Sequence, residues 1–159
     1  LRPFNTFGPH QSNRALIPTI ITQIAHSKKR VSLGNLDTTR DFTYVDDTVM
    51  GFINCIKSKK IEGQIINLGS GYEFSGKKVF NIISKLMNSK IKLIEDKKRF
   101  RPKNSEVMRL LSDNTLAKKL LKWKPKYVGE KGFISGLNKT IEWYLNENNL
   151  QNFNKNYNF

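Results

Sequence analysis

Three polar side chains in this 159-residue sequence have the chemistry to hold a phosphate-bearing ligand. Asn5, in the stretch RPFNTFGP, carries a hydrogen-bond donor and an acceptor and directly follows the strand-like run 1–4. Ligands of open α/β sheets bind beyond the carboxyl ends of strands, which is where this pattern puts Asn5. Arg40, in RDFTYVDD, and Arg101, in RFRPKNSE, carry planar guanidinium groups that bind phosphate through two hydrogen bonds.

Each of these residues also has an ordinary structural explanation. An Asn in a turn commonly bonds its own backbone. Arg40 could form an ion pair with Asp37, Asp41 or Asp46, and Arg101 lies in a charged stretch that fits a solvated basic loop. The residues alone leave both explanations open.

Other motifs give weaker signals. His10 and His26 have no Cys or carboxylate at metal-ligand spacing, so we expect no metal site. The stretch NLGSG follows a strand-like run but is not a G-x-G-x-x-G fingerprint, so it only weakly indicates a phosphate loop. We identify no credible catalytic acid or base in the sequence.

Strand-like runs alternate with amphipathic helices, which is typical of an α/β fold with parallel strand pairing. Pro18 suits the first turn of one helix, whose periodicity puts Ile20, Ile21, Ile24 and Ala25 on one face. Ser75 is the expected N-cap of another helix. A third helix follows Asp47, and its helical spacing predicts a buried face made of Val49, Phe52, Ile53 and Ile56. A last helix is expected over about 130–148. We expect one domain over residues 1–149 and an Asn-rich tail over 150–159.

Composition bears on the class of partner and on the compartment. The formal net charge is +15, but 21 of the 28 basic residues are Lys, and Lys pairs are scattered along the chain. A nucleic-acid-binding module would need clustered Arg interleaved with aromatic residues, so we expect no nucleic-acid partner. No apolar run is long enough to cross a membrane. The single Cys55 is expected to be a core thiol in a reducing compartment, which favours a cytoplasmic protein.

Several stretches, taken in order, resemble one family. They are LRPFNTFGP, IPTIITQI, LGNLDTTRDFTYVDDTV, NLGSG, RPKNSEVMRLLSDNTLAKKLLKWKPKY and GLNKTIEWY. Together they resemble the C-terminal half of extended short-chain dehydrogenases, the NAD-dependent nucleotide-sugar epimerases and dehydratases. The likeness is strongest to the 4,6-dehydratases of legionaminic-type sugar biosynthesis, which serve cell-surface polysaccharides. The implied fold is a substrate-binding lobe with the last strands of a Rossmann-type sheet. The resemblance also leads us to expect that the N-terminal half, with the glycine-rich loop and the catalytic Tyr-x-x-x-Lys segment, is missing from this sequence.

The resemblance implies a role for each position that matches a family motif. Phe4 would lie beside the nicotinamide end of NAD, most of which the missing half would bind. Asn5 would bond the diphosphate region of the sugar nucleotide, and Arg40 and Arg101 would clamp the diphosphate.

The other implied positions surround the nucleoside. Leu16 and Ile17 would lie at the nucleotide, and Val31 and Leu33 would flank the base. Asn104 stands where many relatives carry an Asp for the ribose hydroxyls, and an Asn can still accept such a bond.

The implied reaction takes a hydride from sugar C4, eliminates water across C5 and C6, and returns the hydride to C6. The implied substrate is a nucleotide-diphosphate sugar of the N-acetylglucosamine type, and the intact enzyme would be a homodimer. This chain would bind and orient, would contain no catalytic residue and would be inactive alone. A nucleotide-sugar 4-epimerase shares every motif and is the alternative enzyme. A basic nucleic-acid-binding module is the alternative from a different class.

Overall fold

The computed structural model describes residues 1–26, 29–100 and 102–151, and these residues group into two compact units. Unit 1 is made of Leu1–Gly8, Thr39–Phe74 and Arg109–Gly136. Unit 2 is made of Pro9–Thr38, Ser75–Met108 and Leu137–Phe159. The chain therefore passes between the units several times, and each unit is built from segments that are far apart in the sequence.

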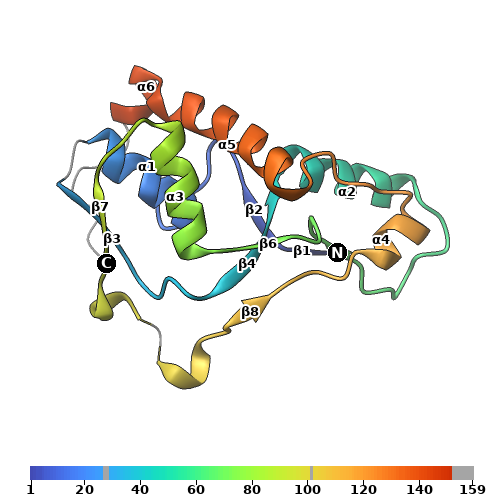
Figure 1. The fold of residues 1–159 in the computed structure, drawn as a ribbon. Coiled ribbons are helices and arrows are strands. Elements are labelled where there is room, and N and C mark those ends of the chain that lie inside the picture. Colours follow the sequence, from blue (N-terminus) through green and yellow to red (C-terminus); the bar gives the residue numbers. More distant parts are fainter. Residues whose placement is uncertain (27–28, 101, 152–159) are drawn as a thin grey trace. The chain divides into compact units, whose positions relative to one another are not determined.

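The strands of unit 1 gather around β4 (Thr39–Tyr44), and two of them pair with it in parallel. β2 (Asn5–Phe7) pairs with the second half of β4, and β8 (Arg109–Leu110) pairs with its first half. β6 (Glu73–Ser75), which begins in unit 1, is the next neighbour of β4 (Figure 1). A separate short pair joins β1 (Arg2–Pro3) to β5 (Asn67–Leu68), also in parallel. The expected α/β fold with parallel strand pairing is confirmed.

Two apolar clusters stabilise unit 1. Phe7 contacts Phe133 and Tyr44 edge-on, with ring centroids 5.1 and 5.5 Å apart, and Phe74 stacks on Phe133 at 4.4 Å. The second cluster holds the buried side chains of Ile66, Leu68, Ala117, Leu121 and Trp123. The expected core thiol, Cys55, is half-buried and packs against this second cluster.

Helix α2 (Val45–Lys57) packs a different face from the one that the sequence predicted. Its buried residues are Asp47, Thr48 and Gly51, whereas Val49, Phe52 and Ile56 are exposed. The small Gly51 lets the helix approach Leu68 so closely that a Cβ there would lie 2.5 Å from a Leu68 methyl carbon. Asp47 is buried because its carboxylate accepts the backbone N–H groups of Lys126 and Tyr127 at 2.8 and 2.9 Å. The expected buried apolar face of this helix is therefore wrong.

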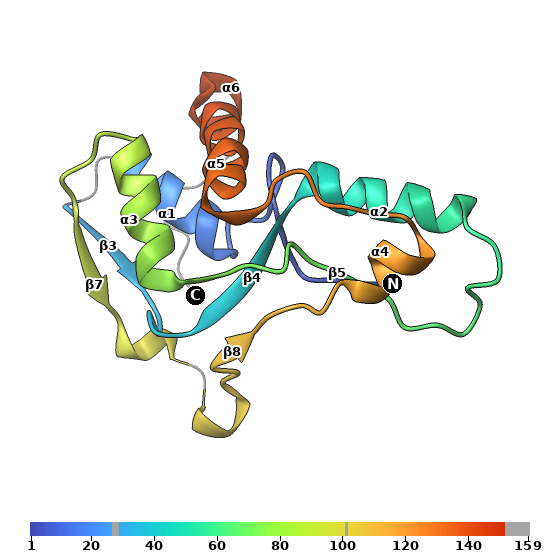
Figure 2. The ribbon, with the colours of Figure 1, turned by 45° about the vertical axis from the view of Figure 1, so that its right-hand side comes forward.

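The short helix α4 (Thr115–Leu120) lies under the C-terminal half of α2 (Figure 2). Asn54 of α2 donates to the carbonyl of Leu121 at 3.2 Å, and Ser58 donates to that of Leu120 at 3.4 Å. Helix α5 (Gly129–Leu145) begins in unit 1, ends in unit 2 and is followed by α6 (Glu147–Gln151).

Unit 2 packs two helices on a two-stranded parallel sheet. The sheet is β3 (Arg30–Leu33) with β7 (Lys92–Glu95). Helix α1 (Leu16–Ala25) contacts β3 and α3 (Gly76–Leu86), and the two helices lie side by side (Figure 1). α1 buries Ile20, Ile21 and Ile24, as its periodicity predicted. Ser75 caps α3 by accepting the N–H of Lys78 at 3.2 Å. Two 3₁₀ turns, η1 (Lys97–Arg99) and η2 (Lys103–Ser105), follow β7.

Across the described residues, no helix combines the length and the apolar character needed to cross a bilayer.

Candidate functional site

Phe4 and Asn5 lie where the N-terminal segment changes its strand partner. Up to Pro3 the segment pairs with β5, and the N–H of Phe4 still donates to the carbonyl of Leu68 at 2.9 Å. From Asn5 onward it pairs with β4, with Asn5 opposite Phe42. The sequence predicted one strand over 1–4 with Asn5 following it, whereas Asn5 is itself the first residue of β2. Both side chains are half-buried, as side chains that line a ligand site beside diverging strands would be.

Arg40 is the second residue of β4 and is half-buried. Its Nη1 donates to the carbonyl of Thr39 at 2.8 Å, which holds the guanidinium close to its own strand. Leu110 of β8 is its neighbour across the ladder. Because a guanidinium carries five N–H donors, it can hold this carbonyl and bind a phosphate at the same time.

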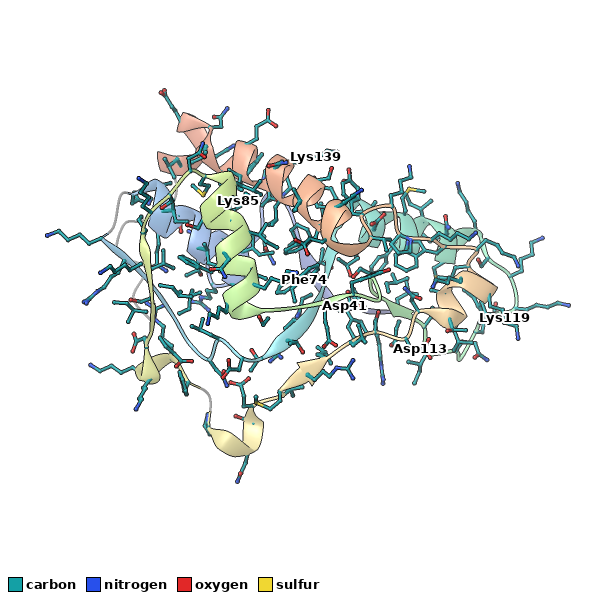
Figure 3. All side chains as sticks on the ribbon, in the orientation of Figure 1. Asp41, Phe74, Lys85, Asp113, Lys119 and Lys139 are labelled. Atoms are coloured by element: carbon teal, nitrogen blue, oxygen red, sulfur yellow. The ribbon has the colours of Figure 1, made fainter. Side chains whose placement is uncertain are left out.

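Asp41 is completely buried, and its carboxylate accepts hydrogen bonds from two other segments. Its side chain is labelled in Figure 3. Oδ1 accepts the N–H and the hydroxyl of Ser70 at 2.8 and 2.6 Å. Oδ2 accepts the N–H of Gly71 at 2.9 Å and the hydroxyl of Ser112 at 2.6 Å. The alternative of an ion pair between Arg40 and Asp41 is therefore disfavoured, because the aspartate is committed to these partners.

The stretch NLGSG, weakly indicated as a phosphate loop, binds an internal anion. The backbone N–H groups of Ser70 and Gly71 point at the Asp41 carboxylate, which is the geometry of an anion-binding nest. Gly71 has a φ of 77°, a left-handed conformation that favours glycine. A Cβ at Gly69 would lie 2.1 Å from the Ser112 hydroxyl oxygen and 2.8 Å from Oδ2 of Asp41.

An ionic cluster joins β4, β6 and β8. The carboxylate of Glu73 forms an ion pair with Arg109 at 2.7 Å and accepts the hydroxyl of Thr39 at 2.7 Å. The hydrogen bond from Arg109, with a second from Thr39, holds the pKa of Glu73 below its ordinary value, and the same pair raises the pKa of Arg109. The cluster fixes the first half of β4, where Arg40 lies.

Four of the expected nucleoside-binding residues lie in unit 2. Leu16 and Ile17 open helix α1, and Val31 and Leu33 lie on β3, which α1 contacts. Leu16 is half-buried, whereas the other three side chains are buried. In the described structure, β3 would therefore present its backbone rather than these side chains to a base.

The backbone of β3 is itself held at one position. The side-chain amide of Gln23 donates to the carbonyl of Ser32 at 3.3 Å and accepts its N–H at 3.0 Å. The carbonyl of Leu33 accepts the N–H of Asp96 at 2.7 Å. These contacts fix the strand on which Val31 and Leu33 lie.

Asn104 is exposed on η2, also in unit 2. Arg101 lies outside the described residues. Phe4, Asn5 and Arg40 thus all belong to unit 1. Unit 2 contains Leu16, Ile17, Val31, Leu33 and Asn104.

One Tyr-x-x-x-Lys string is present, from Tyr127 to Lys131, although we expected none in this sequence. Tyr127 precedes the first residue of α5, so the spacing does not put the two side chains on one face of a helix. The Tyr127 ring packs on Tyr44 with centroids 4.3 Å apart, and Lys131 is exposed. Tyr127 thus packs on Tyr44, and the string is not arranged as a Tyr and Lys on one helix face.

Among the residues that the structure describes, no group of three or more His, Cys, Asp and Glu side chains is placed to hold a metal ion.

Comparison with known proteins gives a consistent set of matches. A family model described as GDP-mannose 4,6 dehydratase matches residues 1–134. The dTDP-D-glucose 4,6-dehydratase of Homo sapiens is 31% identical over 164 residues, which cover 97% of this chain and 43% of that protein. The dTDP-glucose 4,6-dehydratase of Escherichia coli is 28% identical, with 89% of this chain and 40% of that protein covered.

A solved structure shows the same fold. The UDP-glucuronic acid 4-epimerase of Bacillus cereus, in complex with UDP-glucuronic acid and NAD, superposes with a TM-score of 0.79 at 26% identity. The match covers 89% of this chain and 43% of the epimerase. The chain thus spans less than half the length of the relatives that it matches.

Proposed function

We propose that this chain, which belongs to the GDP-mannose 4,6 dehydratase family, forms the nucleotide-sugar-binding part of an NAD-dependent nucleotide-sugar 4,6-dehydratase. The observation that carries the proposal is the family match over residues 1–134. The expected relationship to the NAD-dependent nucleotide-sugar epimerases and dehydratases is confirmed. The reaction, the substrate and the role of this chain in substrate binding are parts of the proposal.

The proposed substrate is a nucleotide-diphosphate sugar of the N-acetylglucosamine type. Arg40 and Arg101 would bind its diphosphate, and Asn5 would hold the adjoining polar groups. Leu16, Ile17, Val31, Leu33 and Asn104 would receive the nucleoside. These contacts are remote from the reacting sugar carbons, and their binding energy would orient the sugar toward the cofactor.

Bound NAD would supply the hydride chemistry at sugar C4. Phe4 is the residue of this chain that we assign to the cofactor, and its half-buried ring beside the point of strand divergence fits that role. We further propose a cytoplasmic homodimer that makes a precursor of cell-surface polysaccharides.

A nucleotide-sugar 4-epimerase is the second candidate. It is favoured by the superposition on the Bacillus cereus UDP-glucuronic acid 4-epimerase. The binding residues named above would serve either reaction, so the product must distinguish them.

The test uses the complete enzyme, meaning a protein of family length that carries this chain. Incubation with NAD and UDP-N-acetylglucosamine should give a 4-keto product lighter by one water, identified by mass spectrometry. A product of unchanged mass with inverted C4 would replace the dehydratase with the epimerase.

A further inference from the structure

Asp41 is a fully buried carboxylate whose hydrogen bonds tie three segments of unit 1 together. Its partners come from the turn at Ser70 and Gly71 and from Ser112, which follows β8. Two of these bonds are 2.6 Å long, as expected when a hydroxyl donates to a charged oxygen. The N–H of Ser112 and the hydroxyl of Thr43 lie farther away, at 3.3 and 3.4 Å.

The surroundings are shaped for this carboxylate. Burying a charge is costly unless hydrogen bonds compensate it, and here two consecutive backbone N–H groups and two hydroxyls do so. Gly69 and Gly71 permit the close approach, the former by lacking a Cβ and the latter by its left-handed φ. Unit 1 thus provides a cradle specific for an acid at position 41.

Arg40 is the residue next to Asp41 on the same strand. Successive side chains of a strand point to opposite faces, so fixing Asp41 in the core directs Arg40 to the other face of β4. The same carboxylate holds Ser112, two residues beyond Leu110, the ladder partner of Arg40. The cradle therefore fixes Arg40 from its own strand and from the neighbouring strand.

We propose that Asp41 is a positioning residue that acts through Arg40, setting the direction in which its guanidinium is presented to the diphosphate of the nucleotide sugar. This inference rests on the proposed function, because it assigns Asp41 to the same binding site. A purely structural Asp41 would stabilise unit 1 without a specific link to Arg40. The two roles predict different coupling between the residues.

The test is a double-mutant cycle in the complete enzyme with Asp41→Asn, Arg40→Ala and the double variant. An amide at position 41 places N–H donors against the donors of Ser70 and Gly71. We expect Asp41→Asn to raise KM for UDP-N-acetylglucosamine about tenfold, the worth of one charge-assisted hydrogen bond, with kcat and NAD affinity nearly unchanged. In the Arg40→Ala background, Asp41→Asn should add little further loss. Asp46→Asn, an exposed aspartate in the first turn of α2, is the control and should leave KM unchanged.

The outcomes separate the two proposals. Suppose that Arg40→Ala raises KM, and that Asp41→Asn raises KM by the same factor in the Arg40→Ala background as in the wild-type enzyme. The positioning role is then wrong, while the binding assignment of Arg40 stands. If Arg40→Ala leaves KM unchanged, the proposed site itself is wrong. Should Asp41→Asn fail to fold, Ser112→Ala removes one donor from the same carboxylate, and its KM effect should likewise vanish in the Arg40→Ala background. Persistence of that effect would overturn the inference.

Discussion

Tyr144 is a residue whose ionisation should report on the folding of unit 2. Its side chain is fully buried, and its hydroxyl donates to the backbone carbonyl of Gln11. Burial raises the pKa of Tyr144 to about 12, from an ordinary value of 10.0. The folded state therefore favours the neutral phenol of Tyr144. The contribution of this phenol to the free energy of unfolding is fully present below pH 10.

We expect the stability of the chain to fall as the pH rises from 10 to about 12, because the unfolded chain ionises at this residue first. Urea unfolding across this range would measure the slope. Tyr144→Phe keeps the ring and removes the ionisation, so its slope should be smaller. Equal slopes for the two proteins would show that Tyr144 titrates like an exposed tyrosine.

Residue types indicated candidate ligands but not their surroundings. The guanidinium of Arg40 could be proposed as a ligand from the sequence, but only the structure shows that the Asp41 carboxylate is occupied by Ser70, Gly71 and Ser112. Ser112 is 71 residues from Asp41, and no local pattern reports so distant a hydrogen bond. The glycines of NLGSG were a visible signal in the sequence for an anion-binding turn. The sequence did not indicate that the bound anion would be the carboxylate of Asp41.

At the scale of elements, features set by neighbouring residues in the sequence were predicted correctly. The face that a helix buries against distant segments was not. The isoleucine periodicity of α1 and the Ser75 cap of α3 are local, and both predictions are confirmed. The apolar spacing of α2 was also a true helix signal, but it selected the wrong face. Gly51 and Asp47 decide that face through Leu68 and the segment before α5, and these partners lie elsewhere in the sequence.

The start of α5 offers a sharp test of close packing. A Cβ at Gly132 would lie 2.3 Å from the carbonyl carbon of Tyr127, where backbone rather than a flexible side chain must move. We expect Gly132→Ala to lower the free energy of unfolding by about 1–3 kcal/mol, measured by urea unfolding. Gly76→Ala is the matched control, because its Cβ would meet its nearest atoms at 3.4 Å, an ordinary contact distance. A loss at Gly76 as large as that at Gly132 would contradict this packing.

The outer face of α2 should make the isolated chain associate. Phe52 and Ile56 are 46% and 85% exposed, beside exposed Val49 and Met50, which is more apolar surface than one helix of a soluble monomer usually shows. We expect concentration-dependent association by analytical ultracentrifugation, reduced by the double substitution Phe52→Lys and Ile56→Lys. Glu62→Lys adds the same charge without removing apolar surface and should leave association unchanged. A monodisperse monomer with a sharp, cooperative melt would refute this prediction.

At the scale of the whole molecule, the chain spans about 43% of its human relative, so its activity is a question about the complete enzyme. The sequence has no G-x-G-x-x-G fingerprint, and its Tyr127–Lys131 string is not arranged on a helix face. We expect the 159-residue chain alone to bind NAD poorly and to give no product with NAD and nucleotide sugars. Mass spectrometry would check this, and a clear 4-keto product from the chain alone would disprove it.

The central claim is that this chain binds the diphosphate of a nucleotide sugar through Arg40 and Arg101. Calorimetric titration of the complete enzyme with UDP-N-acetylglucosamine and, separately, with NAD tests it most directly. Arg40→Ala and Arg101→Ala should each weaken nucleotide-sugar binding by about 1.5–3 kcal/mol, the worth of a charge-assisted hydrogen bond. NAD binding should barely change. Equal losses for the two ligands, or no loss for the nucleotide sugar, would contradict the account.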